Sequence, residues 1–240
     1  MSVAKAEKIG TLVNGNPYVG RGIVIGKSED GKSACFAYFI MGRSVNSRNR
    51  VFVEEGKDVI IHPFDLEKAG DPSLIIYSPI RYYENNIIVT NGNQTDTIYD
   101  FLSKGEGFCK ALSTREFEPD APNFTPRISG MLTFDGKGDF SYKMSILKAA
   151  DDEGTACNRF TYRYAALKGI GHFIHTYKCD GNPIPTFEGE PERVLLPNTA
   201  KELADDIWAN LNEENKISLY VKYINLETGA EEKILINKNK

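Results

Sequence analysis

The stretch from Ser33 to Met41 (S-A-C-F-A-Y-F-I-M) is apolar or aromatic at nearly every position. A strand with one face in water alternates polar and apolar side chains, whereas a continuous apolar run predicts a strand that is covered on both faces. Another strand is predicted at 22–26, and the Asp30-Gly31 turn between the two suits a hairpin because it supplies the positive φ that such turns need. The fold must therefore place a layer on each side of this hairpin.

Short β segments and hairpins dominate the rest of the chain, and helices are expected in two regions only. Short helices are predicted at about 97–102 and 108–112, and a longer one begins after Thr199, where Glu202 completes a capping box. Because hairpins dominate and several strands need cover on both faces, we expect an α+β fold with two mainly antiparallel sheets facing each other and helices outside. The further predicted strands are 51–53, 59–61, 74–77, 82–83, 87–90, 128–134, 140–147, a pair at 160–165 and 172–177, 217–224 and 233–236.

Length and charge restrict the class of protein. The chain has 240 residues and a formal net charge of −4. We expect one domain over 1–240, with a polar lead-in at 1–15. The negative charge argues against a general nucleic-acid-binding surface, and no apolar run reaches the length that spans a bilayer. Since the N-terminus lacks the apolar core of a signal peptide, we expect a cytoplasmic protein.

The spacing of cysteine and histidine gives no indication of a metal site. No C-x-x-C pair occurs, and scattered cysteines fit a reducing cytoplasm. His172 and His175 are three residues apart in a predicted strand, so their side chains should face opposite sides and should not share a metal. We therefore predict that the protein binds no metal. The four cysteines are Cys35, Cys109, Cys157 and Cys179.

Three arginines fall within the eight residues from Arg43 to Arg50, directly after the buried strand. Guanidinium groups bind phosphate through paired, charge-assisted hydrogen bonds, and a loop at a strand end projects easily into a cleft. The loop is therefore a candidate phosphate clamp, helped by the serine and asparagine side chains around it. The alternative is a solvated loop whose charges pair with surface carboxylates, and the residues alone leave both interpretations open.

A strand, a polar turn and a helix start follow one another between Ile87 and Leu102. The turn, N-G-N-Q, is rich in amides, and Thr95 or Asp96 is expected to cap the helix. Backbone N–H groups are unpaired at such a position, which suits an anionic or amide-bearing ligand. An Asn-Gly turn before an ordinary capped helix needs no ligand, so this alternative also stays open.

Four short segments carry a family resemblance: Y-V-G-R at 18–21, S-R-N-R ending at Arg50, T-N-G-N-Q-T-D at 90–96 and T-P-R-I-S-G at 125–130. Together they resemble the archaeal-type IMP cyclohydrolase family, in the family's order and at similar intervals. They cover roughly the first half of the chain, and the second half matches loosely through G-I-G-H-F-I-H-T-Y. Each segment is weak alone, but the set is fairly specific.

The resemblance implies a four-layer α-β-β-α sandwich, the architecture of N-terminal nucleophile hydrolases. It implies an enzyme of de novo purine biosynthesis that closes the purine ring of 5-formamidoimidazole-4-carboxamide ribotide, giving IMP and water. It implies no metal and no organic cofactor. The expected partner is a small purine ribonucleotide, with no nucleic acid and no membrane, and a homo-oligomer stays open.

The resemblance and the needs of the reaction suggest which residues bind the substrate. The 5′-phosphate needs cations, and Arg50 is the best placed, with Arg21 and Arg43 as helpers. The carboxamide or formyl oxygen needs donors, which the backbone after Gly92 would supply together with the amides of the same motif. The substrate-binding candidates from that motif are Asn91, Gly92, Asn93 and Asp96.

Three further residues are candidates for the chemistry. Arg127 would stabilise the tetrahedral adduct, which develops an oxyanion. Tyr77 matches a family tyrosine and would donate a proton, and Glu118 matches a family acid and would act as the base. The alternatives are a sheet-edge aromatic for Tyr77 and a surface-loop carboxylate for Glu118.

Two other functions remain compatible with the sequence. An amidohydrolase of the N-terminal nucleophile kind would need a Ser, Thr or Cys whose free amine starts the first strand. Ser2 lies far upstream of the strand at 22–26, which disfavours this function. A purine-nucleotide-binding protein without activity would keep the arginine pocket and differ only in turnover.

Overall fold

The computed structural model describes residues 5–68 and 77–239, and these residues form two antiparallel sheets. The fold is α+β, as predicted. In spatial order, the six-stranded sheet contains β11 (Glu192–Leu195), β10 (Ile170–His175), β1 (Arg21–Lys27), β2 (Ser33–Met41), β12 (Lys216–Asn225) and β13 (Glu231–Asn237). The seven-stranded sheet contains β3 (Val51–Glu55), β4 (Asp58–His62), β5 (Ile80–Tyr83), β6 (Asn86–Thr90), β7 (Arg127–Phe134), β8 (Phe140–Ala149) and β9 (Cys157–Ala165).

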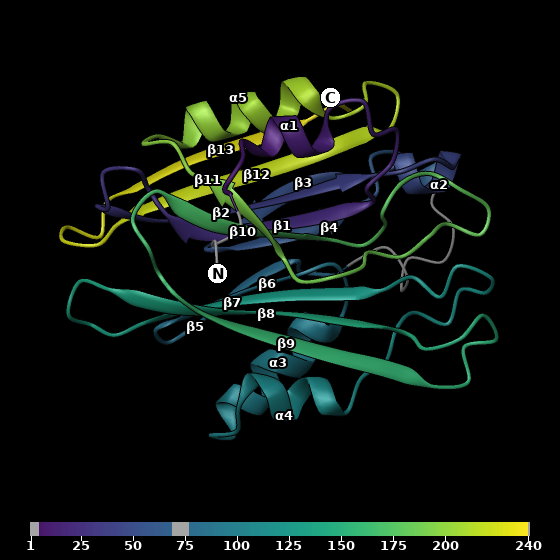
Figure 1. Cartoon of the computed structure of the whole chain (residues 1–240), viewed down its shortest axis with the longest axis horizontal. Coiled ribbons are helices and arrows are strands. Elements are labelled where there is room, and N and C mark those ends of the chain that lie inside the picture. Colours follow the sequence, from purple (N-terminus) through teal and green to yellow (C-terminus); the bar gives the residue numbers. More distant parts are fainter. Residues whose placement is uncertain (1–4, 69–76, 240) are drawn as a thin grey trace.

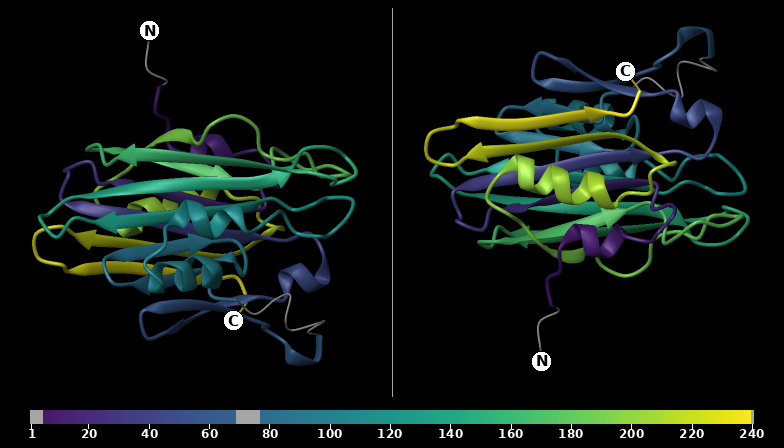
Figure 2. Two further views of the ribbon diagram at one scale, coloured as in Figure 1. Left: turned by 90° about the horizontal axis from the view of Figure 1, so that it is seen from below. Right: turned by 90° about the horizontal axis from the view of Figure 1, so that it is seen from above.

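The two sheets face each other, and helices cover the outer face of each one (Figure 1). Helices α1 (Ile9–Val13) and α5 (Ala200–Asn210) lie over the six-stranded sheet. Helices α3 (Gln94–Ser103) and α4 (Phe108–Ser113) lie over the seven-stranded sheet. Figure 2 shows the same two helix pairs from below and from above. The order of layers is therefore α-β-β-α, as expected.

Strand β2 is buried on both faces, as its composition predicted. Phe36 and Tyr38 pack in the core between the sheets, whereas Cys35 and Phe39 pack in the core beneath α1 and α5. The sheets approach closely where β1 crosses β7. A Cβ on Gly130 would lie 2.5 Å from the Cδ1 atom of Ile25, so a side chain here would displace the end of Ile25.

Most predicted elements are found within a few residues of their expected bounds. The capping box at Thr199 and Glu202 opens α5, as predicted. His172 and His175 point to opposite faces of β10, also as predicted, because His172 stacks on Tyr164 of the other sheet while His175 stacks on Phe173. Most of the predicted strand at 74–77 lies outside the described residues.

The expectation of a polar lead-in at 1–15 is wrong for its second half. Ile9 and Val13 lie on one face of α1 and are buried against α5 in the outer core. The carboxylate of Asp206 accepts a hydrogen bond of 2.8 Å from the backbone N–H of Gly10, which ties the two helices together. A helix of five residues is too short for its periodicity to be recognised in sequence.

Several other details differ from the sequence expectations. The strands at 160–165 and 172–177 do not pair, because β9 pairs with β8 and β10 pairs with β1 in the other sheet. Helix α3 begins at Gln94, with Asn93 at its N-cap, rather than after Thr95 or Asp96. The arginine loop contains a short helix, α2 (Val45–Arg48), which was not predicted. The 3-10 turn (Leu66–Lys68) and strand β11 were not predicted either.

In the two described ranges, no helix has both the length and the apolar character needed to cross a membrane.

Candidate active site

A cavity of about 440 Å³ opens where β1 and β7 begin and β6 ends, so both sheets contribute to its wall. It contains seven of the ten residues that the sequence singled out. The described residues that line it are Arg21, Arg50, Tyr77, Gly92, Asn93, Glu118, Pro119, Asp120 and Arg127.

Arg21 and Arg50 bring two positive charges into this cavity from different sheets. Arg21 opens β1, and Arg50 directly precedes β3. The Nε atom of each is buried and has no hydrogen-bond partner among the described residues, and neither guanidinium forms an ion pair there. The pKa of Arg50 is lowered, first by burial and then by repulsion from Arg21. Two partly buried cations that form no ion pair among the described residues make a site that favours an anion.

The hydrogen-bond partner of Arg127 is a neutral side chain, and the carboxylate of Glu118 lies at a longer ion-pair distance. Its Nη1 atom donates a 2.8 Å hydrogen bond to the side-chain oxygen of Gln94, whereas the nearest Glu118 oxygen is 3.8 Å away. Burial lowers the pKa of Arg127, and the negative charge of Glu118 opposes that shift. Because an amide oxygen binds a guanidinium without neutralising it, Arg127 keeps its charge for a ligand.

Gln94 is fully buried, and its remaining hydrogen bonds fix its orientation. Its amide nitrogen donates to the side-chain oxygen of Asn91 at 2.9 Å and to the backbone oxygen of Ile128 at 3.2 Å. Asn91 in turn donates to the backbone oxygen of Pro126 at 2.8 Å and accepts from the N–H of Ile128 at 2.9 Å. These bonds tie the turn after β6 to the start of β7, and so they place Arg127.

Gly92 is needed because of this close approach. A Cβ at that position would lie 2.6 Å from the Nη1 atom of Arg127 and 2.7 Å from the side-chain oxygen of Gln94. Both distances are shorter than van der Waals contact, so a side chain here would displace the guanidinium. The absence of a side chain at Gly92 therefore makes room for Arg127 and Gln94 and is not required by the backbone conformation of the turn.

Tyr77 and Glu118 bring a phenol and a carboxylate into the cavity, which Asp120 also lines. The hydroxyl of Tyr77 lies 3.2 Å from that of Tyr38, which is fully buried in β2. Burial raises the pKa of Tyr77, although the charges of Arg21 and Arg50 oppose that rise. The Tyr77 phenol is therefore protonated at neutral pH, as a proton donor must be. Glu118 is anchored through its backbone N–H, which donates to the backbone oxygen of Thr125 at 2.9 Å.

The structure places three of the ten candidates outside the cavity. Arg43 forms an ion pair with Asp180 and lies 5.2 Å from the ring centroid of Tyr18. Asp96 forms a surface ion pair of 2.7 Å with Arg81. Asn91 is buried, and its side-chain amide is hydrogen-bonded to the backbone of Pro126 and Ile128. These three side chains are therefore unsuited to contact a ligand in the cavity.

Sequence reasoning missed Pro119 and Asp120 of the cavity wall, and it missed Gln94 and Tyr38 behind that wall. Asp120 lines the cavity and accepts from the backbone N–H of Thr125 at 2.6 Å, so it also shapes the loop before β7. Gln94 belongs to the same polar turn as the predicted residues, and only its burial distinguishes it from an ordinary helix residue. Tyr38 has no sequence signal at all, because it is one aromatic residue in an apolar strand.

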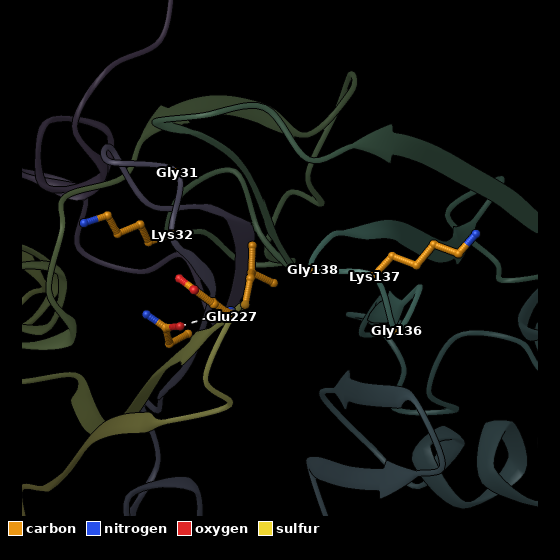
Figure 3. Close-up of a pocket in the computed structure, with 8 residues that line it drawn as sticks. Gly31, Lys32, Gly136, Lys137, Gly138 and Glu227 are labelled. Carbon is orange, nitrogen blue, oxygen red and sulfur yellow. Dashed lines mark hydrogen bonds between the residues drawn. The ribbon is translucent and has the colours of Figure 1, made fainter.

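Two larger hollows lie elsewhere, and neither contains a candidate residue. One, of about 520 Å³, lies among three hairpin turns at the opposite end of β1, where Lys32, Lys137 and Glu227 surround it (Figure 3). The other, of about 830 Å³, lies beside α5 and β11, with an apolar floor that includes Ile170 and Leu196. Among the hollows of the described residues, the arginine cavity thus stands out for its buried, unpaired cations.

Comparison with known proteins finds relatives that match most of this chain. The IMP cyclohydrolase of Methanocaldococcus jannaschii is 29% identical over 213 residues, which cover 86% of this chain and 94% of that protein. The IMP cyclohydrolase of Methanopyrus kandleri is 30% identical over 186 residues, which cover 71% of this chain and 89% of that protein. The IMP cyclohydrolase of Methanococcus aeolicus is 29% identical over 167 residues, covering 68% and 75% respectively. A sequence model of the family described as "IMP cyclohydrolase-like protein" matches residues 18–229, which include every residue that lines the arginine cavity. With the match extending from the strand that carries Arg21 to the final hairpin, the chain belongs to the IMP cyclohydrolase-like protein family.

Proposed function

We propose that this protein is an IMP cyclohydrolase that closes the purine ring of 5-formamidoimidazole-4-carboxamide ribotide to give IMP and water, and that residues 1–240 work as one domain. The single observation that carries the proposal is the cavity in which Arg21, Arg50 and Arg127 converge from three separate segments of the chain. Relatives named IMP cyclohydrolase match most of the chain, which supports the same activity. The layer order is also compatible with the N-terminal nucleophile hydrolase architecture that the family resemblance implies.

The 5′-phosphate of the nucleotide would bind between Arg21 and Arg50. Both guanidinium groups line the cavity, and both have buried N–H groups that no described residue accepts. A phosphate would satisfy these donors through charge-assisted hydrogen bonds and would remove the repulsion between the two cations. This would leave Arg127, on the seven-stranded sheet, for the opposite end of the ligand.

Ring closure begins when the carboxamide nitrogen attacks the formyl carbon. A carboxamide is a poor nucleophile, so holding both groups in line would contribute strongly to the rate. A carbon–nitrogen bond forms, the carbonyl oxygen becomes an oxyanion, and Arg127 with the backbone beyond Gly92 would stabilise that charge. Glu118 would accept the proton that the attacking nitrogen loses and would pass it to the oxyanion, which becomes a hydroxyl. The amide of Asn93, whose side-chain oxygen accepts from Arg115, also faces the cavity and would orient the carboxamide.

Dehydration completes the reaction. The carbon–oxygen bond of the adduct breaks, and Tyr77 would supply the proton with which the hydroxyl leaves as water. The neighbouring ring nitrogen loses its proton as the carbon–nitrogen double bond forms, and that proton would restore Tyr77. Each proton released by the substrate is thus returned, and the enzyme ends the cycle in its starting state.

The experiment combines a turnover assay with calorimetry. Purified protein is incubated with the formamido ribotide while the absorbance of the product is followed, and IMP is titrated separately. We expect turnover and saturable binding of IMP. Tight binding of IMP without turnover would instead identify a nucleotide-binding protein, and absence of both would refute the proposal. An amidohydrolase that uses a terminal amine gains no support, because β1 begins with Arg21 and follows α1.

A further inference from the structure

A pair of tyrosine hydroxyls joins the two sheets beneath the arginine cavity. Tyr38 lies on β2 of the six-stranded sheet, and its hydroxyl is 3.2 Å from that of Tyr77, which lines the cavity from the segment before β5. The ring of Tyr38 is fully buried and stacks on Phe52 of β3 with a centroid separation of 5.6 Å. Its position is therefore fixed by packing rather than by the hydroxyl contact.

The number of available acceptors decides which hydroxyl donates. Among the described residues, the hydroxyl of Tyr38 has one hydrogen-bond partner, the oxygen of Tyr77. If Tyr77 donated, the Tyr38 proton would be buried without an acceptor, which is costly. If Tyr38 donates, the proton left over belongs to Tyr77, and that phenol faces a cavity that holds the carboxylate of Glu118 and has room for a substrate.

We propose that Tyr38 is a positioning residue whose hydroxyl donates to Tyr77 and so turns the Tyr77 proton into the cavity, toward the oxygen that leaves the substrate as water. The catalytic consequence rests on the proposed cyclohydrolase function, whereas the direction of the hydrogen bond does not. A donor to the Tyr77 oxygen also stabilises the phenolate that forms when Tyr77 gives up its proton.

Burial is the largest influence on the pKa of both phenols. Burial raises the pKa of both tyrosines, and the hydrogen bond between them lowers the pKa of Tyr77 while it raises that of Tyr38 further. A hydrogen bond favours the charged form of the acceptor and the neutral form of the donor. The charges of Arg21 and Arg50 act on both groups in the same sense, so they do not select between the two directions.

The direction can be tested without any turnover. Protein labelled with 13Cζ-tyrosine is titrated by NMR, and the Tyr77 signal is assigned by its loss in Tyr77→Phe. If Tyr38 donates, Tyr38→Phe removes a stabiliser of the phenolate and raises the pKa of Tyr77 by about 0.5 to 1 unit. A fall in that pKa, or no change, would overturn the proposal. Should Tyr38→Phe not fold, the reciprocal titration of Tyr38 in Tyr77→Phe gives the same answer, with a fall in the pKa of Tyr38 expected.

Kinetics test the positioning role. We expect Tyr38→Phe to lower kcat about 10-fold and to leave KM within about threefold. In a Tyr77→Phe background the same substitution should cost nothing more, because Tyr38 acts only through Tyr77. A full multiplicative loss in the double variant would show that Tyr38 has a merely structural effect.

The chain offers a matched control. Tyr220 is the direct cross-strand neighbour of Tyr38, is equally buried, and donates its hydroxyl to Glu54 away from the cavity. Tyr220→Phe should leave kcat unchanged.

The two proposals can fail separately. Absence of turnover in the wild-type protein would refute the proposed function, whereas the NMR titration would still decide the direction of the hydrogen bond between Tyr38 and Tyr77.

Discussion

Arg127 donates to the side-chain oxygen of Gln94 at 2.8 Å, and this contact joins the first residue of β7 to the first residue of α3. Both side chains are buried, and the acceptor is neutral. The arginine is therefore held in place while its charge stays available. An ion pair at the same distance would hold the guanidinium as firmly but would weaken its attraction for an oxyanion.

Replacing Gln94 by leucine should affect both stability and catalysis. The change removes the acceptor of Arg127 and the donor to the backbone oxygen of Ile128. Buried groups left without partners should lower the free energy of unfolding by about 2–4 kcal/mol, measured by urea denaturation. The turnover number should fall about 100-fold, because Arg127 loses its orientation. Ser103→Ala, at the exposed end of the same helix, is the control and should change neither quantity.

Gly92→Ala tests how closely the backbone must approach Arg127. The new methyl group would lie 2.6 Å from the Nη1 atom of Arg127, so kcat/KM should fall about 100-fold. Gly107 is a fair comparison because a Cβ there meets nothing within 4 Å. Steady-state kinetics of both alanine variants would decide the matter. Equal activities would mean that the guanidinium tolerates displacement.

Arg50→Ala tests the phosphate site. The loss of a charge-assisted contact of about 2–3 kcal/mol should raise KM about 30- to 150-fold. The fold should survive, and stability should not fall, because burial and repulsion from Arg21 both act against the Arg50 charge. The matched control is Arg48→Ala. Arg48 donates to the backbone oxygen of Gly42 at 3.1 Å and to Asn215 at 2.8 Å, so its loss should lower stability without changing KM. An unchanged KM in Arg50→Ala would place the phosphate elsewhere.

His172 should make stability depend on pH. Its Nδ1 atom lies 2.6 Å from the Tyr142 hydroxyl, and burial first, with repulsion from Arg193, lowers the pKa of His172 from 6.5 to about 4. Between pH 6.5 and about pH 4, His172 is therefore protonated in the unfolded chain but neutral in the folded protein. The free energy of unfolding consequently falls as the pH decreases through this window. Because the ring is only partly buried, we expect a loss of about 1–2 kcal/mol.

The measurement for His172 is urea denaturation at about pH 7 and about pH 4.5. His172→Gln keeps an acceptor for Tyr142 but has no group that titrates in this range. The variant should lose less stability than the wild type between the two conditions, since carboxylate titration is common to both. Equal losses would show that His172 already binds its proton in the folded state at the lower pH.

The sequence by itself determined most of the strands and the class of fold. The unbroken apolar run of β2 required cover on both faces, and two facing sheets with outer helices supply it. Short motifs also marked residues that the cavity brings together, among them Arg50, Glu118 and Arg127. Such features are local, because a residue's own neighbours set strand periodicity, turn chemistry and the spacing of a motif.

Only the tertiary structure decided which strands pair and which arginines face the cavity. The strands β9 and β10 are neighbours in sequence but belong to different sheets. Arg43 and Arg50 lie in the same loop, yet Arg43 forms an ion pair with Asp180, a residue far along the chain. Arg50 forms no ion pair among the described residues. The physical reason is that burial and charge pairing depend on contacts between distant segments, which no local pattern encodes.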